Sequence, residues 1–455
     1  YSDGYVVVEV GLFGPADAYL EAAKTSLGRV AADNSALAFA ARAGAEHLRG
    51  EDERALEIAG KGLAAHKDDH RLMLVEMWAL RSLGRKGEAQ KVYEAIRTIA
   101  PHYLPALQIA LLNAVDDGDA ASTKRYSAEL MTLSSGDLVG ALGSIAVRLP
   151  GWYDDANASE AEAVREDMAT LEKHFGDAPP RISALGFYLL GRVDLEAGRL
   201  EKAVASLRTA LGKRPSDRLE AWTALAVRRE EGPKAALALL GSSDAGKSPE
   251  IASLKARCQL DLHHVDSAEA AVAALESNGA PDAAELAWIL AVRRGDAAKA
   301  VEKLPAAIGP RLEWIGLEMH DLLRRDGDAE GVKALAERFE NGECADAIRA
   351  FHGSDAGRVF SIFESEKKRS VPCVAALTAR LMRGHLAPSA VREAANAAVL
   401  ASEGDLRTRI DQALAVWLTD GQSAAAKALD EIAAERPESG LLLEALTEAY
   451  LIAGL

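Results

Sequence analysis

The segment Gly241–Ser248 contains the residue types of a phosphate-binding loop. It ends in Gly246, Lys247 and Ser248, and such loops hold phosphate groups with glycine backbone N–H groups, a lysine and a hydroxyl. A phosphate-binding loop follows a β-strand, whereas an apolar helical pattern precedes Gly241. We therefore do not expect nucleotide binding at this segment.

The histidines and cysteines could ligate a metal ion only if their side chains converged. His263 and His264 are adjacent and so point to different sides of a helix, and Cys258 lies five residues before His263, which is not an ideal ligand spacing. The chain also lacks the short signatures that surround the nucleophiles of known hydrolases. The sequence therefore predicts no metal, no cofactor and no catalytic residue, and we do not expect an enzyme.

The charge of the chain argues against nucleic acid as a partner. Its 455 residues include 69 acidic and 53 basic residues, with a formal net charge of -16. Phosphate-binding surfaces need clustered Lys and Arg, and the tight basic run Lys367–Arg369 is interpreted as a solvated loop or helix end. No stretch reaches the roughly 18 apolar residues that span a bilayer. We expect neither nucleic-acid binding nor direct membrane insertion.

The cysteines and the first residue bear on the compartment. Cys258, Cys344 and Cys373 lie far apart and are odd in number, so they imply no disulfide framework. A reducing compartment is then the simpler interpretation. Because the chain begins at Tyr1 without Met, a removed targeting segment is compatible with the sequence. We expect the cytoplasm, with the periplasm as the alternative.

Regularly spaced glycines indicate how the chain is organised. Gly50, Gly84 and Gly118 are 34 residues apart, and Gly198 and Gly232 show the same spacing. Helical patterns of similar length lie before and after each glycine, and glycine can adopt the left-handed backbone that ends a helix. The high alanine content and the scarcity of aromatic residues, at 5%, also favour helices that approach closely. The pattern predicts a repeated pair of antiparallel helices.

Residues 184–217 resemble a tetratricopeptide repeat, whose period is also 34 residues. The matching large, small and turn positions are Phe187, Leu190, Gly191, Gly198, Ala203, Leu207, Ala210 and Pro215. Asp194 departs from the motif, which has a Tyr-like residue there. The resemblance implies an all-α, right-handed superhelical solenoid of antiparallel helix hairpins.

The repeats and their interruptions predict the domain organisation. The expected segments are 1–35, an N-terminal strand and lead-in helix; 36–137, three repeats; 138–183, an irregular helical hairpin with a long loop; 184–249, two repeats; and 250–455, degenerate hairpins truncated in a further repeat. The strand is the β-branched run Tyr5–Val10. In the long loop, Trp152 and Tyr153 are either a binding loop or a plug between irregular repeats.

The resemblance also implies a binding groove, because the first helix of each tetratricopeptide repeat lines the concave face. Carried onto this chain, the groove positions are Arg71, Leu74, Trp78, Arg81, Gln108, Tyr188, Arg192, Trp222 and Arg229. Arginine and aromatic side chains in an acidic protein suit a partner protein or peptide with acidic groups. The alternative is that Trp78 and Trp222 belong to the hairpin core and that the arginines pair with neighbouring glutamates.

The expected function is therefore that of a protein-interaction scaffold or adaptor. On the family resemblance and the Ala-, Gly- and Arg-rich composition, we expect it to act within a larger bacterial assembly. The alternative is a regulatory or sensor segment of a larger protein whose catalytic part lies outside this chain.

Overall fold

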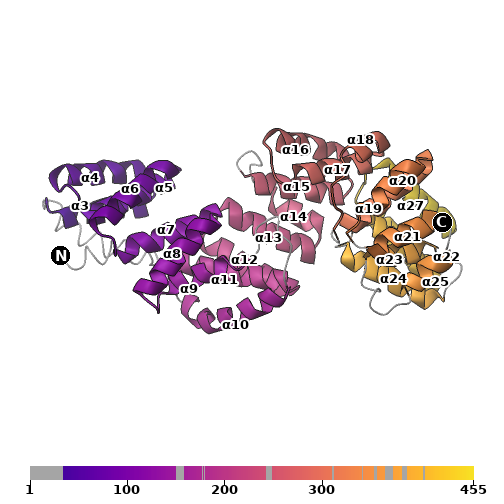
Figure 1. Ribbon diagram of the computed structural model, residues 1–455, viewed down its shortest axis with the longest axis horizontal. Coiled ribbons are helices and arrows are strands. Elements are labelled where there is room, and N and C mark those ends of the chain that lie inside the picture. Colours follow the sequence, from indigo (N-terminus) through magenta and orange to yellow (C-terminus); the bar gives the residue numbers. More distant parts are fainter. Residues whose placement is uncertain are drawn as a thin grey trace. The chain divides into compact units, whose positions relative to one another are not determined.

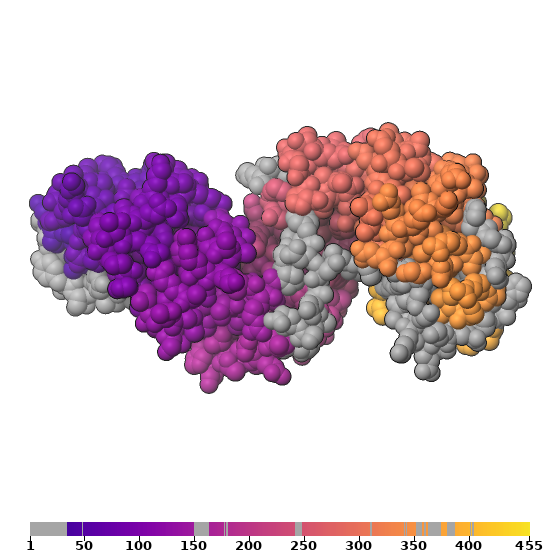
Figure 2. All heavy atoms as spheres, viewed as in Figure 1, coloured from indigo at the N-terminus to yellow at the C-terminus, as the bar shows by residue number. Residues whose placement is uncertain are grey.

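The protein is all-α in its computed structural model, over the residues that the model describes. These are residues 34–149, 158–176, 178, 180–241, 248–309, 312–340, 342–352, 356–363, 372–381, 387–402 and 405–455; the remainder is grey in Figures 1 and 2. The predicted strand Tyr5–Val10 and the candidate loop residues Trp152 and Tyr153 lie outside these ranges. Among the described helices, none is both long and apolar enough to cross a bilayer.

The chain divides into two compact units, residues 1–223 and 224–455, which are described separately. The division falls within the two repeats expected over residues 184–249, inside helix α13 (Asp217–Glu230).

The first unit is built from successive antiparallel helices (Figure 1). They are α3 (Ala36–Leu48), α4 (Asp52–Ala65), α5 (His70–Ser82), α6 (Lys86–Ile99), α7 (Leu104–Asp117), α8 (Ala120–Leu133), α9 (Leu138–Ala146), α10 (Ala158–Phe175), α11 (Pro180–Glu196) and α12 (Leu200–Lys213). Helices α3 and α4, α5 and α6, α7 and α8, and α11 and α12 form hairpins. The fold is thus the tetratricopeptide-like hairpin array that the sequence predicts.

The turns of these hairpins contain the regularly spaced glycines. Gly50, Gly84, Gly118 and Gly198 have φ angles of 80°, 74°, 71° and 73°. In this left-handed region a side chain would be strained, whereas glycine is not. The predicted role of these glycines as helix-ending turns is confirmed.

Gly191 lets α11 and α12 approach closely. A Cβ atom at this position would lie 2.6 Å from Cγ of Leu207, which is fully buried on α12. Small residues at helix crossings and large residues in the holes beside them give this kind of packing. The match of Gly191 and Leu207 to the repeat motif therefore has a direct physical cause.

We expect Gly191→Ala to lower the free energy of unfolding by about 1–3 kcal/mol, because the added methyl overpacks the α11–α12 crossing. Gly212→Ala on α12 is the matched control, since a Cβ atom there meets nothing within 4 Å. The control should be neutral or stabilising by about 0.5–1 kcal/mol. Urea unfolding measures both, and equal effects of the two substitutions would contradict this explanation.

The second unit continues as helix hairpins with several short members. Its helices are α14 (Pro233–Leu239), α15 (Pro249–Asp261), α16 (Val265–Ser277), α17 (Ala283–Arg294), α18 (Ala297–Glu302), α19 (Glu313–Asp326), α20 (Ala329–Ala336), α21 (Gly342–His352), α22 (Ala356–Phe363), α23 (Pro372–Leu381), α24 (Pro388–Ala401), α25 (Leu406–Asp420), α26 (Gln422–Ala433) and α27 (Gly440–Ile452). Turn glycines with positive φ recur at Gly295, Gly327 and Gly421.

The segment before α27 and α27 itself contact helices from the start of the second unit, namely the turn between α15 and α16 and helix α17. The backbone N–H of Glu438 donates to the carbonyl oxygen of His263 at 2.9 Å, and Ser439 Oγ donates to the carbonyl of Arg293 at 2.7 Å. Helix α27 also packs against α17. In an open solenoid each repeat contacts only its neighbours. The second unit departs from that arrangement.

The cysteines correct one expectation from the sequence. Cys258 and Cys344 are both buried, and Cys344 is disulfide-bonded. The side chain of Cys373 lies outside the described residues. The sequence implies no disulfide framework, yet Cys344 forms a disulfide, because spacing along the chain does not show which thiols the fold brings together.

We expect a reducing agent to lower the stability of the second unit by about 2–4 kcal/mol, the usual effect of losing a disulfide. Thermal unfolding with and without reductant measures the effect, and peptide mapping without reduction identifies the partner of Cys344. Cys344→Ser should remove the sensitivity to reductant, while Cys258→Ser should preserve it. A wild-type protein whose unfolding midpoint does not respond to reductant would contradict this.

Candidate functional site

Helix α7 ends in two adjacent carboxylates, Asp116 and Asp117, and Gly118 then turns the chain with a φ of 71°. Both aspartates are exposed. The last carbonyl groups of a helix have no partner within that helix and carry partial negative charge. This helix end therefore attracts cations.

Two cations from the preceding hairpin bind Asp117. Arg81 donates to its Oδ1 at 2.5 Å, and Lys86 Nζ donates to the same oxygen at 2.7 Å. Burial raises the pKa of Asp117, but the hydrogen bonds from Arg81 and Lys86 outweigh it and hold the pKa below its ordinary value. The Asp117 carboxylate is therefore charged at neutral pH.

Three arginines from helices much later in the chain reach the same helix end. Arg181 and Arg214 lie 3.2 Å and 2.8 Å from Oδ2 of Asp116. Arg218 donates to the carbonyl oxygen of Val115 at 2.9 Å. The fold thus brings residues 65 to 103 positions apart in the chain onto one surface.

We call these five side chains the basic cluster: Arg81, Lys86, Arg181, Arg214 and Arg218. Four of these cations pair with the carboxylates of Asp116 and Asp117, and Arg218 donates to carbonyl oxygens at the end of α7. Burial, against the opposing effect of Asp116 and together with the charges of Arg214 and Arg81, lowers the pKa of Arg181 to about 10. The cations therefore repel one another, and an additional anion would relieve that repulsion.

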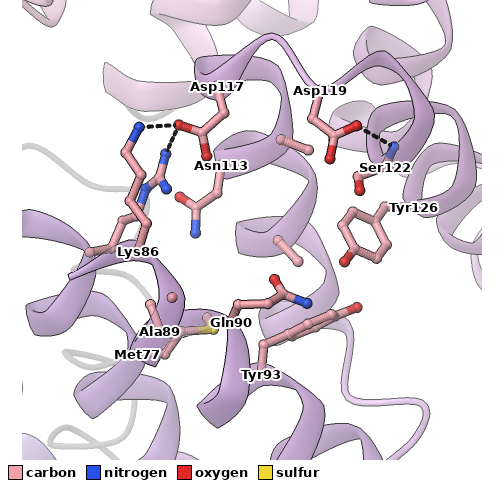
Figure 3. Close-up of a pocket in the computed structure, with 14 residues that line it drawn as sticks. Met77, Lys86, Ala89, Gln90, Tyr93, Asn113, Asp117, Asp119, Ser122 and Tyr126 are labelled. Atoms are coloured by element: carbon pink, nitrogen blue, oxygen red, sulfur yellow. Dashed lines mark hydrogen bonds and ion pairs between the residues drawn. The ribbon is translucent and has the colours of Figure 1, made fainter. Parts of the chain in front are cut away.

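A pocket of about 280 Å³ adjoins the basic cluster, between α5, α6, α7 and α8 (Figure 3). At one side Lys86 reaches Asp117, and at the other Asp119 accepts from the backbone N–H of Ser122 at 3.0 Å. Its wall also includes Tyr93 and Tyr126, whose rings meet edge to face at 5.4 Å. The pocket therefore combines an aromatic wall with a rim of amide, hydroxyl and charged groups.

The predicted groove residues Tyr188, Arg192 and Trp222 lie together in the first unit. The Arg192 guanidinium stacks 3.8 Å from the centroid of the Trp222 ring and donates to the Tyr188 hydroxyl at 3.0 Å. Burial raises the pKa of Tyr188, but Arg192 and then Arg218 outweigh it, so the pKa is lowered. This places the buried trio beside Arg218 of the basic cluster.

The remaining groove residues of α5 are placed differently. Leu74 is fully buried, and Trp78, 6% exposed, stacks on His47 with ring centroids 4.9 Å apart. Arg71 pairs at 2.5 Å with Asp69, which caps its own helix. Of the groove residues on α5, Arg81 is the one that joins the basic cluster.

Two further groove residues lie apart from this site. Gln108 donates to Asp137 at 2.5 Å. Arg229 is half-buried and belongs to the second unit. Sequence reasoning did not identify Lys86, Arg181, Arg214 or Arg218, because their meeting depends on helices distant in the chain.

The segment Gly241–Ser248 joins helix α14 to helix α15, so no strand precedes it. Its glycines and lysine have the spacing of a phosphate-binding loop, but the strand-to-helix setting of that loop is missing.

Among the described residues, the side chains that could together hold a metal ion are those of His263, Glu318 and Asp405 in the second unit.

No known family model matches the chain, and no curated protein matches its sequence. Among solved structures it is similar to the Cut9–Hcn1 hetero-tetramer of the APC/C, at 13% identity over 92% of this chain and 84% of that one, with a TM-score of 0.37. It is also similar to the TPR domain of P58(IPK), at 12% identity over 90% and 96%, with a TM-score of 0.30. Yeast Tom70 matches at 13% identity over 96% and 92%, with a TM-score of 0.25. The assignment of the fold rests on the helices and turns described above.

Proposed function

We propose that this chain is a protein-interaction scaffold whose first unit binds an acidic segment of a partner protein. The observation that carries the proposal is the basic cluster, in which four cations pair with the carboxylates of Asp116 and Asp117 and a fifth, Arg218, donates to the carbonyl oxygen of Val115. In a chain with a net charge of -16, such a concentration of cations is a local exception. Arginine binds carboxylates with two parallel hydrogen bonds, which suits it to this role.

The pocket beside the cluster supplies the second part of the proposed interface. A partner residue of modest size could occupy its volume of about 280 Å³ against the tyrosine wall while a neighbouring carboxylate reaches the basic cluster. Interfaces commonly combine an aromatic anchor site with a charged rim. We propose binding rather than catalysis because the pocket combines an aromatic wall with amide and charged groups, which are groups suited to recognition.

We propose that the chain acts within a larger bacterial assembly, because its composition is rich in Ala, Gly and Arg. The disulfide of Cys344 favours the periplasmic alternative over the cytoplasm, since disulfides persist in oxidising compartments.

The proposal is tested by fluorescence anisotropy with the full chain and two labelled peptides of equal length. One carries alternating glutamate and leucine, and the other has lysine in place of glutamate. The acidic peptide should bind more tightly, and its affinity should fall as salt is raised, because salt screens exposed charges. Equal affinity for both peptides, or binding of the lysine peptide alone, would contradict the proposal.

A further inference from the structure

A histidine occupies the turn between α15 and α16 where other hairpins have glycine. His263 has a φ of 56°, in the same left-handed region as Gly84 and Gly118. A side chain at such a φ is strained, and strained positions that persist often serve a function. The strain is maintained by the backbone contacts of the turn, in which the N–H of His263 donates to the carbonyl of Leu260 at 2.8 Å.

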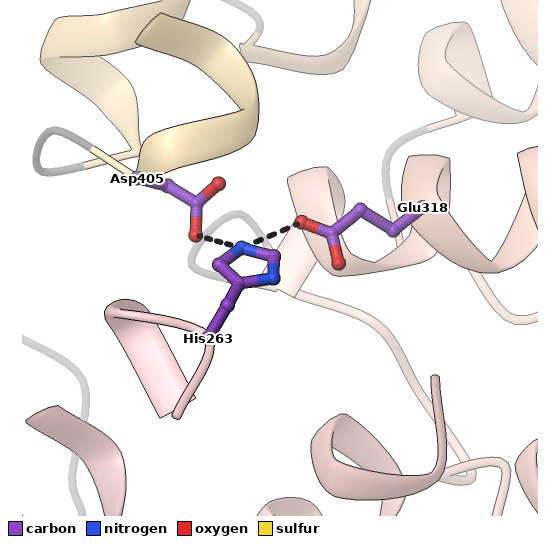
Figure 4. Close-up of side chains that lie close together, drawn as sticks. All are labelled: His263, Glu318 and Asp405. Atoms are coloured by element: carbon purple, nitrogen blue, oxygen red, sulfur yellow. Dashed lines mark ion pairs between the residues drawn. The ribbon is translucent and has the colours of Figure 1, made fainter. Parts of the chain in front are cut away.

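The side chain of His263 points into the second unit, between two carboxylates (Figure 4). Its Nε2 lies 4.0 Å from Oε1 of Glu318 on α19 and 3.9 Å from Oδ2 of Asp405, which precedes α25. All three residues are buried, with His263 only 1% exposed. The cluster therefore joins three helix hairpins away from solvent.

Neither ring nitrogen of His263 has a hydrogen-bond partner among the described residues. The distances of 3.9 Å and 4.0 Å are too long for hydrogen bonds to the carboxylates. Buried polar groups in folded proteins nearly always have a partner, so an imidazole aimed at two carboxylates without one requires an explanation.

We propose that His263, Glu318 and Asp405 bind a divalent transition-metal ion of the zinc class. One nitrogen and two carboxylate oxygens lie within 4.8 Å of one another. Zinc bonds of about 2.0–2.2 Å place neighbouring ligands roughly 3.3 Å apart, so modest rotations of the carboxylates would close the site. The imidazole favours zinc over magnesium or calcium, which prefer oxygen ligands alone.

Arg293 on α17 orients both carboxylates. It forms an ion pair with Oδ2 of Asp405, and its Nε lies 3.5 Å from Oε2 of Glu318, leaving Oε1 of Glu318 toward His263. The other oxygen of Asp405 accepts from the backbone N–H of Arg407 at 2.9 Å. Ligands held by such secondary contacts are positioned before the metal arrives. The ion would hold the turn between α15 and α16 against α19 and the start of α25.

The test uses the full chain, treated with a chelator, dialysed and then titrated with Zn²⁺ by calorimetry, and with Co²⁺ while the visible absorption is recorded. We expect one equivalent of Zn²⁺ to bind, a higher unfolding midpoint with Zn²⁺, and a visible Co²⁺ spectrum. Mg²⁺ should not compete. A wild-type chain that binds no Zn²⁺ would overturn the proposal.

His263→Gly is the decisive variant, because glycine accepts the positive φ and removes only the ligand. It should fold, as circular dichroism would show, and lose Zn²⁺ affinity by more than about 100-fold, beyond the effect of changing an outer contact. His264→Gln is the matched control and should bind as the wild type does. Undiminished Zn²⁺ binding by folded His263→Gly would place the ion elsewhere and also overturn the proposal.

Discussion

Replacing Lys86 and Arg214 together with glutamate is expected to weaken binding of the acidic peptide by about 10–100-fold, the effect of reversing charges at an electrostatic interface. The two side chains are 62% and 39% exposed, so they can reach a partner. Asp117 retains Arg81 and Asp116 retains Arg181 in this variant. The fold should therefore survive while the surface loses its excess of cations.

Stability measurements distinguish this loss of binding from unfolding. Exposed ion pairs contribute only about 0–1 kcal/mol each, so the double variant should unfold near the wild-type midpoint. The control for net charge is Lys61→Glu combined with Lys299→Glu, which changes the charge by the same amount; both lysines are exposed and pair with Glu57 and Asp296, outside the basic cluster. If the control weakens binding as much as the double variant does, the affinity depends on overall charge and not on the basic cluster.

Arg293→Met is expected to destabilise the second unit by about 3–5 kcal/mol, the usual cost of removing one partner of a buried ion pair. Arg293 is fully buried, pairs with Asp405 and is near Glu318. Burial raises the pKa of Asp405, but Arg293 outweighs it and holds the pKa below its ordinary value. Without Arg293, two carboxylates would remain buried without their cation.

Arg294→Met is the matched control for this prediction. Arg294 is the next residue on α17, and its ion pairs with Asp266 and Glu269 are exposed. Its replacement should cost no more than about 1 kcal/mol. Urea unfolding of both variants in the chelated protein separates the buried pair from the proposed metal, and similar losses in both would contradict the role of Arg293.

The hairpins could be predicted from the sequence because they form locally. A glycine with positive φ ends a helix through contacts with the residues just before it, so Gly84 and Gly118 mark turns without any knowledge of distant segments. Gly191 and Leu207 likewise meet within one hairpin. The same period that identifies the repeats therefore also determines their internal packing.

The candidate sites depend on contacts between distant segments, which the period does not encode. Arg181 lies before the repeat predicted to begin at Ala184, because α11 starts at Pro180, and it reaches Asp116 from 65 residues away. Sequence reasoning considered His263 only beside its neighbours in the chain. The two carboxylates near His263 belong to Glu318 on α19 and to Asp405 at the start of α25. They reach His263 only because later helices of the second unit pack back against its first ones.

The predicted groove residues divide according to which side of a helix they occupy. Successive residues differ by about 100° around a helix, so an uncertainty of one position separates a groove from a core. Trp78 and Trp222 are both buried, whereas Arg81 extends to the basic cluster. The sequence left these two possibilities open.

Hydrogen exchange of the full chain with and without the acidic peptide tests the central proposal most directly. Binding at the basic cluster and its pocket predicts slower exchange at the end of α7, in the turn from α5 to α6 and at the start of α11. The Lys86→Glu, Arg214→Glu variant should show no such protection. Protection confined to the second unit, or protection that persists in the variant, would contradict the proposal.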